Sequence, residues 1–254
     1  MTMPPAGQLP AGVPPGFPGC ARCPYVRTGP ARICLACARQ TFEGISLRAC
    51  PICSQMLDDD GTCPNWLCTD SRRRISRIHA IAYQSGPLRT VINNYKYNGA
   101  RGWVLIFGRL VLGWLEEHAA WNPPGLIVAN PTYTGPGGRD FAHTEAVLEA
   151  ASREDVQRRW PFDLATPRAV VKTRATAASA NATAKAKRAA ASELRSALSV
   201  PDPSRTAGRR ILVYDDVCTT ASQLDAVADC LLTQGRAAHV EALVLARAPW
   251  RRRT

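Results

Sequence analysis

The residues best suited to chemistry are two adjacent carboxylates, Asp215 and Asp216, in the stretch RILVYDDVCTTASQ that spans residues 210–223. The apolar run before them, residues 211–214, is typical of a strand buried on both faces. Ligands of open parallel sheets bind beyond the carboxyl ends of such strands. Two carboxylates at that place can accept hydrogen bonds from a pair of vicinal hydroxyls, as in a ribose.

A small, hydroxyl-rich turn follows the carboxylates and leads into a predicted helix that ends at Gly235. The turn consists of Thr219, Thr220, Ala221, Ser222 and Gln223. A helix N-terminus after a tight turn offers unpaired N–H groups and a positive dipole end, which suit a phosphate. Ser222 and Asp225 have the spacing of a capping box at this helix start. The stretch therefore predicts a ribose 5-phosphate site; the alternative is a buried strand whose acidic pair only caps a loop.

Eight of the ten cysteines lie between residues 20 and 68. They form three CxxC pairs and one wider pair: Cys20 and Cys23, Cys34 and Cys37, Cys50 and Cys53, Cys63 and Cys68. A CxxC knuckle points two sulfurs at one metal, so the spacing predicts one or two structural zinc ions, each with four thiolates. The simplest pairing takes the first four and the last four cysteines, and an interleaved pairing stays open. A disulfide framework is the weaker alternative, because no secretion signal is recognisable.

The composition says more about the binding partners than about the fold. The chain has 254 residues, 46% of them hydrophobic, which is enough for one main domain and a small module. Lys and Arg outnumber acidic residues 32 to 20, giving a net charge of +12 that favours nucleic acid, nucleotides or phosphorylated sugars. The most apolar stretch, residues 103–115, contains Arg109 and predicts a buried amphipathic helix instead of a membrane span. We therefore expect a soluble, cytoplasmic protein.

Apolar runs and helical periodicity alternate along the rest of the chain. Strands are expected near residues 79–83, 126–130, 169–172, 211–214 and 239–245. Helices are expected over residues 86–98 and 140–151, and three more are expected to begin at residue 103, to end at residue 198 and to begin at residue 222. This alternation predicts an α/β fold with a mostly parallel, doubly wound sheet. None of the four histidines has a partner at ligand or triad spacing in the sequence.

Two stretches resemble a known family. RILVYDDVCTTASQ is similar to the phosphoribosyl-diphosphate (PRPP) motif of type I phosphoribosyltransferases, in which an apolar strand leads to D-D-V-x-T-T-G-A-T. HAIAYQSGPLRTVINNYKYNG, residues 79–99, resembles the ComF pattern Y-x-G-x-L-R-x-L-I-x-x-x-K-Y-x-G. A cysteine cluster before such a domain also resembles the ComF family, and the likeness covers roughly residues 20–247 in order.

The resemblance implies a role for each matching residue. Asp215 and Asp216 would bind the ribose hydroxyls, residues 219–223 would hold the 5-phosphate, and Mg²⁺ would accompany the pyrophosphate. The candidates for pyrophosphate and mobile-loop contacts are Lys96, Arg139, Lys172, Arg174 and Arg188. The turn departs from the family at Ala221 (for Gly), Ser222 (for Ala) and Gln223 (for Thr). In the R-G-F-N motif, Arg139 and Phe141 match, whereas Asp140 and Ala142 do not.

Composition, cysteine spacing and the likeness together predict four segments: a disordered Pro/Gly-rich leader (1–19), a zinc-binding module (20–70), a phosphoribosyltransferase-like domain (75–248) and a basic tail (249–254). Two functions follow. One is PRPP binding with transfer of ribose 5-phosphate to a nitrogen nucleophile and release of pyrophosphate. The other is a non-catalytic adaptor of DNA uptake that binds single-stranded DNA or competence-machinery proteins. The intact acidic pair favours the first function, and the departures at Ala221 and Asp140 favour the second.

Overall fold

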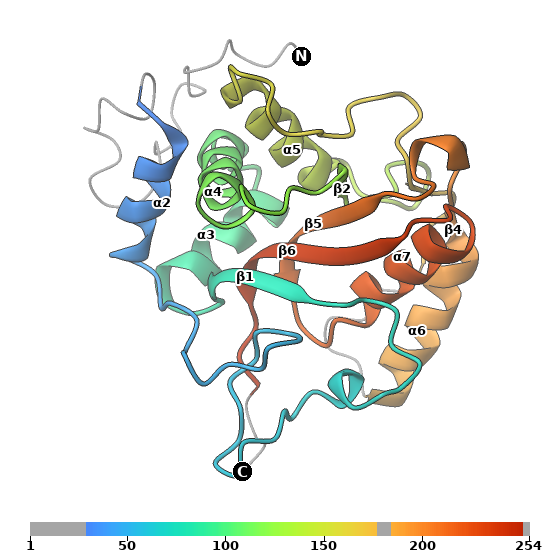
Figure 1. Ribbon diagram of the computed structural model, residues 1–254, viewed down its shortest axis with the longest axis horizontal. Coiled ribbons are helices and arrows are strands. Elements are labelled where there is room, and N and C mark those ends of the chain that lie inside the picture. Colours follow the sequence, from blue (N-terminus) through green and yellow to red (C-terminus); the bar gives the residue numbers. More distant parts are fainter. Residues whose placement is uncertain (1–28, 177–183, 251–254) are drawn as a thin grey trace.

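A four-stranded parallel sheet forms the centre of the computed structural model, which describes residues 29–176 and 184–250 (Figure 1). The strands lie in the order β1 (Ile78–Tyr83), β6 (His239–Arg247), β5 (Arg210–Cys218) and β2 (Leu126–Ala129). All three pairings are parallel. The predicted α/β fold with a parallel sheet is therefore confirmed, and β5, which carries the acidic pair, is a central strand. The predicted leader and residues 251–254 of the predicted tail lie outside the described residues.

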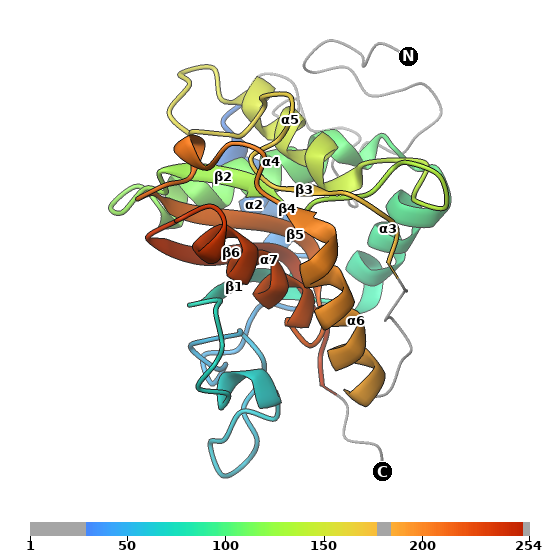
Figure 2. The same ribbon diagram turned by 90° about the vertical axis from the view of Figure 1, so that its right-hand side faces the viewer.

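Helices cover both faces of this sheet (Figure 2). One face carries α2 (Ala31–Arg39), α3 (Gly86–Tyr97), α4 (Trp103–His118) and α5 (His143–Glu154), and the other carries α6 (Ala184–Ala197) and α7 (Ser222–Thr233). Alternate residues of β5 supply the two cores: Leu212 and Tyr214 pack with the first set of helices, Ile211 and Val213 with the second. This arrangement explains why the apolar run before the acidic pair shows no polar alternation.

Helix α4 is the most deeply enclosed element. Every residue from 103 to 115 is buried, where the sequence pattern had predicted a single apolar face. Gly113 allows α2 to approach closely, because an added Cβ would lie 2.9 Å from the carbonyl oxygen of Ala31. The buried Arg109 is neutralised by Glu154, and its Nε donates to Cys34 Sγ at 2.9 Å. Among the described residues, no helix has the length and apolar character needed to cross a membrane.

Three predicted boundaries were wrong. The strand expected over 211–214 is longer, because β5 continues through the acidic pair to Cys218. The strand expected over 169–172 is reduced to β3 (Val171–Lys172), which pairs antiparallel with β4 (Leu198–Ser199) outside the main sheet. The N–H of Ala169 instead donates to the buried carboxylate of Asp163 at 2.6 Å, so the chain there is held by a side chain and not by a strand. Helix α5 begins at His143 and not at residue 140. Two short 3₁₀ turns, η2 (Trp66–Cys68) and η3 (Pro203–Arg205), complete the described elements.

Candidate functional site

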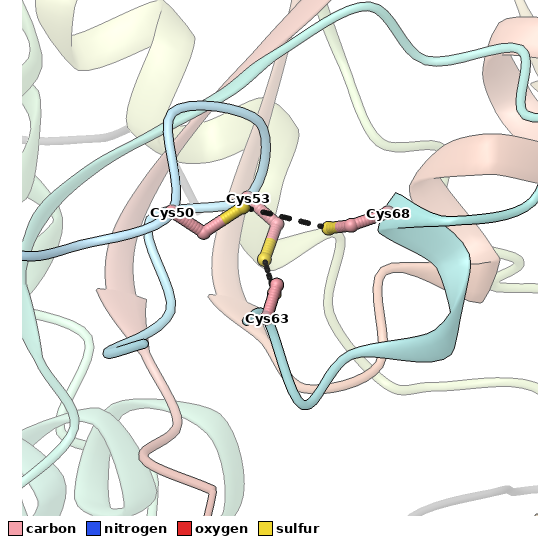
Figure 3. A group of neighbouring side chains, drawn as sticks. All are labelled: Cys50, Cys53, Cys63 and Cys68. Atoms are coloured by element: carbon pink, nitrogen blue, oxygen red, sulfur yellow. Dashed lines mark hydrogen bonds between the residues drawn. The ribbon is translucent and has the colours of Figure 1, made fainter. Parts of the chain in front are cut away.

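Four cysteines converge on one point beside the sheet (Figure 3). The sulfurs of Cys50, Cys53, Cys63 and Cys68 all lie within 4.8 Å of one another. The Sγ–Sγ distance is 3.8 Å between Cys50 and Cys68 and 3.7 Å between Cys53 and Cys63. A tetrahedral zinc ion with Zn–S bonds of about 2.3 Å separates its sulfurs by about 3.8 Å, whereas a disulfide needs about 2 Å. These four residues, here called the four-cysteine centre, therefore fit one structural zinc ion with every ligand position filled by protein.

Backbone hydrogen bonds attach the four-cysteine centre to the sheet. The first knuckle closes on itself, since Ser54 N donates to Cys50 O at 2.9 Å. It also joins the start of β1, because Ile78 N donates to Ile52 O at 2.7 Å and Ser54 Oγ donates to Ile78 O at 2.8 Å. Cys50 and Cys53 belong to the same buried cluster as the α7 face of the sheet. The centre is thus bonded to the parallel sheet and packs against its core.

The other predicted zinc site is described only in part. Cys20 and Cys23 lie outside the described residues. Cys34 and Cys37 are one helical turn apart on α2, where Cys34 is buried and Cys37 is exposed. Helix α2 packs against α4, on the opposite face of the sheet from α7. A second site with four cysteines therefore stays a prediction, as does the boundary of the module predicted over 20–70.

The acidic pair is buried at the C-terminal end of β5, with Asp215 6% and Asp216 2% exposed. Asp216 Oδ1 accepts a hydrogen bond from Lys96 Nζ at 2.8 Å. Asp215 accepts from Asn130 Nδ2 at 2.8 Å and from the N–H of Asp216 at 2.8 Å. The fourth oxygen, Asp216 Oδ2, has no hydrogen-bond partner among the described residues, although His143 Nε2 lies 3.2 Å away. This oxygen is enclosed by protein, with the imidazole of His143 beside it.

Burial and neighbouring charge give the two carboxyls different protonation behaviour. Burial, together with the charge of Asp216, raises the pKa of Asp215 to about 7. Burial acts in the same direction on Asp216, but the Lys96 ammonium, His143 and the hydrogen bonds of this carboxylate together outweigh it and hold the pKa of Asp216 below its usual range. Burial lowers the pKa of His143 to about 4, so its imidazole is neutral at pH 7. The site then holds an ionised Asp216 next to an Asp215 that titrates near neutral pH.

His143 is the site residue that sequence reasoning missed, because no histidine has a partner at ligand or triad spacing in the sequence and only the fold brings His143 to Asp216. The imidazole reaches Asp216 because α5 starts just beyond the C-terminal end of β2, the strand next to β5. Tyr95 Oη donates to the carbonyl oxygen of His143 at 2.7 Å and holds the helix start in place. Adjacent parallel strands end at one edge of the sheet, and that rule was the available signal for finding this residue.

The turn after the acidic pair has the geometry of an anion-binding loop. Ala221 is the N-cap of α7 and adopts a left-handed conformation, with φ 66° and ψ 0°. The hydroxyls of Thr220 and Ser222 lie 3.0 Å apart. In the described part of the chain, the N–H groups of Thr219, Thr220, Ser222 and Gln223 have no hydrogen-bond acceptor. Unpaired N–H groups at a helix start, preceded by a left-handed residue, form a concavity that suits a phosphate.

The predicted capping box is wrong. Asp225 turns away from the helix start, and its Oδ1 accepts from the N–H groups of Arg74 at 2.7 Å and Ile75 at 3.1 Å. Its Oδ2 accepts from Arg195 at 2.8 Å. Asp225 therefore attaches the segment after the four-cysteine centre to α7, which leaves the N–H groups at the start of α7 free for a ligand.

The five cationic candidates divide into two groups. Lys96 pairs with Asp216. Arg139 is exposed over the ring of Tyr97, and its charge contributes, after burial, to lowering the pKa of Lys172 and of His143. Lys96 and Arg139 thus both influence His143, and Arg139 also influences Lys172, so these three cations form the first group. Arg174 instead pairs with Glu193 on α6. Arg188 also lies on α6, but its side chain is outside the described part.

No known family model matches the chain, and no curated protein matches it. What the structure shows is a cluster of four cysteines fit for zinc followed by a parallel α/β sheet.

Proposed function

We propose that the C-terminal edge of β5 binds the ribose 5-phosphate portion of PRPP, as the resemblance to ComF-type phosphoribosyltransferases implies. The observation that carries the proposal is the buried pair Asp215 and Asp216 at the C-terminal end of β5, just before a turn with N–H groups that have no acceptor in the described structure. Ligands of open parallel sheets bind at this edge, where carboxylates accept hydrogen bonds from hydroxyl donors. A ribose hydroxyl is such a donor, and the turn proposed to bind the phosphate begins three residues after Asp216.

The turn supplies the second half of the recognition. Free N–H groups and two hydroxyls at the start of α7 match the oxygens of a 5-phosphate, and the helix dipole adds favourable charge. A phosphate at the turn and vicinal hydroxyls at Asp216 belong to one sugar phosphate. Neither half alone specifies it, since a helix N-terminus binds many anions.

The cations at the edge of the site would meet the pyrophosphate. Arg139 and Lys172 are the side chains available for this contact, and Mg²⁺ bound to pyrophosphate oxygens would neutralise charge on the leaving group. If transfer occurs, the ionised Asp216 would lie close to the sugar carbon where positive charge develops, before a nitrogen nucleophile replaces pyrophosphate. The residues present suit catalysis by positioning and charge.

The test is calorimetric titration of the zinc-loaded protein with PRPP, with and without Mg²⁺. We expect saturable binding that weakens at least about tenfold in Asp216→Asn, the change expected from losing one charged hydrogen bond. Asp163→Asn is the matched control, because Asp163 is also buried and paired with a cation, Arg205. Circular dichroism verifies that both variants are folded. Absence of PRPP binding by the wild type, or equal binding by Asp216→Asn, refutes the proposal.

A nucleic-acid-binding adaptor is the second candidate. It is favoured by the net charge of +12 and by the Lys96 and Asn130 side chains that already occupy the acidic pair. Fluorescence anisotropy with labelled single-stranded DNA at two salt concentrations measures this binding, which must weaken steeply with salt. Under the adaptor function, DNA binding is the same in Asp216→Asn and the wild type, and PRPP does not compete.

A further inference from the structure

Arg247, the last residue of β6, connects the four-cysteine centre to the turn that follows β5. It is fully buried, at 0% exposure. Nη1 donates to the carbonyl oxygens of Cys218, at 2.8 Å, and of Thr219, while Nη2 donates to Cys53 Sγ at 3.6 Å. One guanidinium therefore contacts a metal-ligand candidate on one side and the first peptides of the turn on the other.

The contacts made by these two carbonyls determine where the next two N–H groups point. In a planar trans peptide, the C=O of one residue and the N–H of the following residue point in opposite directions. Arg247 holds the carbonyl of Thr219 on its own side, so the N–H of Thr220 is directed away from it. The carbonyl of Cys218 is held both by Arg247 and by the N–H of Ala248, at 2.9 Å, so the sheet also fixes the N–H of Thr219. These N–H groups have no acceptor among the described residues, so they are available to an anion.

Charge explains why a buried guanidinium is tolerated at this place. An isolated buried cation is strongly unfavourable, and such groups occur in pairs. A zinc ion bound by four thiolates carries a net charge of about −2, the sum of four negative sulfurs and one divalent cation. Cys53 is the ligand in contact with Arg247, so the zinc-loaded centre would supply the counter-charge that keeps the guanidinium in place.

We propose that Arg247 is a positioning residue that couples the four-cysteine centre to the phosphate-binding turn. Zinc bound at the centre anchors the guanidinium, and the guanidinium holds the peptide after Thr219 with its N–H toward the ligand. This coupling deepens the proposed function and rests on it for the identity of the ligand. It gives the zinc centre a role in ligand affinity in addition to its role in folding.

The test compares two conservative substitutions at equally buried arginines, in zinc-loaded protein. Arg247→Lys keeps the charge but loses the planar fork that reaches two carbonyls and a sulfur at once. Arg109→Lys is the matched control, because Arg109 is 2% exposed and also contacts a cysteine sulfur, but on the α4 side of the sheet. Zinc content and thermal unfolding are measured first for both variants.

The first readout is the ¹⁵N order parameter of the Thr220 amide. We expect about 0.85 in the wild type and in Arg109→Lys, and below about 0.6 in Arg247→Lys with wild-type zinc content. The second readout is calorimetric affinity for ribose 5-phosphate, expected to weaken about tenfold only in Arg247→Lys. The third is the equilibrium affinity for zinc, measured by competition with a chelator, which ribose 5-phosphate must raise in the wild type and not in Arg247→Lys, because coupling between binding free energies is reciprocal.

Unchanged order parameters in Arg247→Lys, or an equal loosening in Arg109→Lys, overturn the proposal. A wild type that binds neither ribose 5-phosphate nor PRPP would refute the proposed function alone. The order parameters would still decide whether Arg247 positions the turn, so the two failures are distinguishable.

Discussion

Removing the Lys96 ammonium should destabilise the fold far more than removing both members of its ion pair. Lys96 Nζ lies 2.8 Å from Asp216 Oδ1, and the two side chains are only 13% and 3% exposed. Lys96→Met leaves a buried carboxylate next to Asp215, with no cation in contact. The double variant Lys96→Met/Asp216→Asn leaves no such charge.

The magnitude follows from distance and burial. With an effective dielectric constant of about 20, two unit charges at this distance attract by about 6 kcal/mol, most of which offsets their desolvation. Breaking a buried pair from one side typically costs about 3–5 kcal/mol, because the remaining charge is uncompensated. We therefore expect Lys96→Met to lower the free energy of unfolding by about 3–5 kcal/mol at pH 8, and the double variant to recover at least half of that loss.

The pH dependence identifies the cause. The lowered pKa of Asp216 stabilises the wild type above the ordinary Asp value, and this contribution is lost as the pH falls through the folded-state pKa. Without Lys96, the pKa of Asp216 must rise, so the carboxyl takes up a proton under mildly acidic conditions. The deficit of Lys96→Met should therefore shrink between pH 8 and pH 5, whereas that of the double variant should stay constant.

Urea unfolding of the zinc-loaded proteins, followed by circular dichroism at both pH values, measures these differences. The m-value must be the same in all variants for the free energies to be compared. The reasoning is refuted if Lys96→Met costs less than about 1 kcal/mol at pH 8, the range of an exposed ion pair. It is also refuted if the double variant is no more stable than the single one.

Three further substitutions test single features of the structure. Asp215→Asn should gain stability relative to the wild type by roughly 2–4 kcal/mol as the pH rises from 4 to 8. The carboxyl of Asp215 ionises in the unfolded chain from about pH 4 but keeps its proton in the folded protein until its raised pKa of about 7, so rising pH favours unfolding of the wild type. A parallel pH profile of the two proteins in urea unfolding would contradict the assignment. Glu241→Gln should lower the free energy of unfolding by about 1–2 kcal/mol at pH 6, a value reduced for solvent screening, and by almost nothing near pH 2. The reason is that hydrogen bonds from His79 and then His239, acting against burial, lower the pKa of Glu241 to about 2. An equal loss of stability at both pH values would count against this assignment. Ala221→Gly should raise the free energy of unfolding by up to about 1 kcal/mol, because relief of the left-handed strain exceeds the entropy cost of glycine; a clear loss in thermal unfolding would show that the Ala221 methyl contributes more by packing.

The central strand and its turn could be predicted from sequence because their signals are local. An apolar run, two carboxylates and a helical repeat follow one another directly along the chain, and the parallel pairing of β5 follows from the alternation of strands and helices. The partners of the acidic pair could not be predicted in this way. Lys96 and His143 are 120 and 73 positions from Asp216, and only the parallel stacking of strand ends brings the three side chains together.

The cysteine segment shows the same division between local and distant signals. The CxxC spacing predicts a metal centre, and the structure gathers Cys50, Cys53, Cys63 and Cys68 as a zinc ion requires. No spacing rule shows that Arg247, 194 positions from Cys53, contacts that centre. Nor does a spacing rule show that Asp225 binds the backbone of Arg74 instead of capping its own helix. Both contacts are made by buried charged side chains, whose partners are set by the tertiary fold.

At Ala221 the backbone conformation conflicts with the residue type. A left-handed residue with a Cβ costs about 1–2 kcal/mol, and the similar family motif has glycine at this place. A turn without a binding role could relax toward an ordinary helix start and use the N–H groups for capping. Instead the strained conformation is kept, the capping side chain of Asp225 is engaged elsewhere, and Arg247 holds the preceding carbonyls. Backbone strain that its surroundings maintain is characteristic of a ligand-binding segment, and here the N–H groups without acceptors follow directly on the strand end that carries the acidic pair.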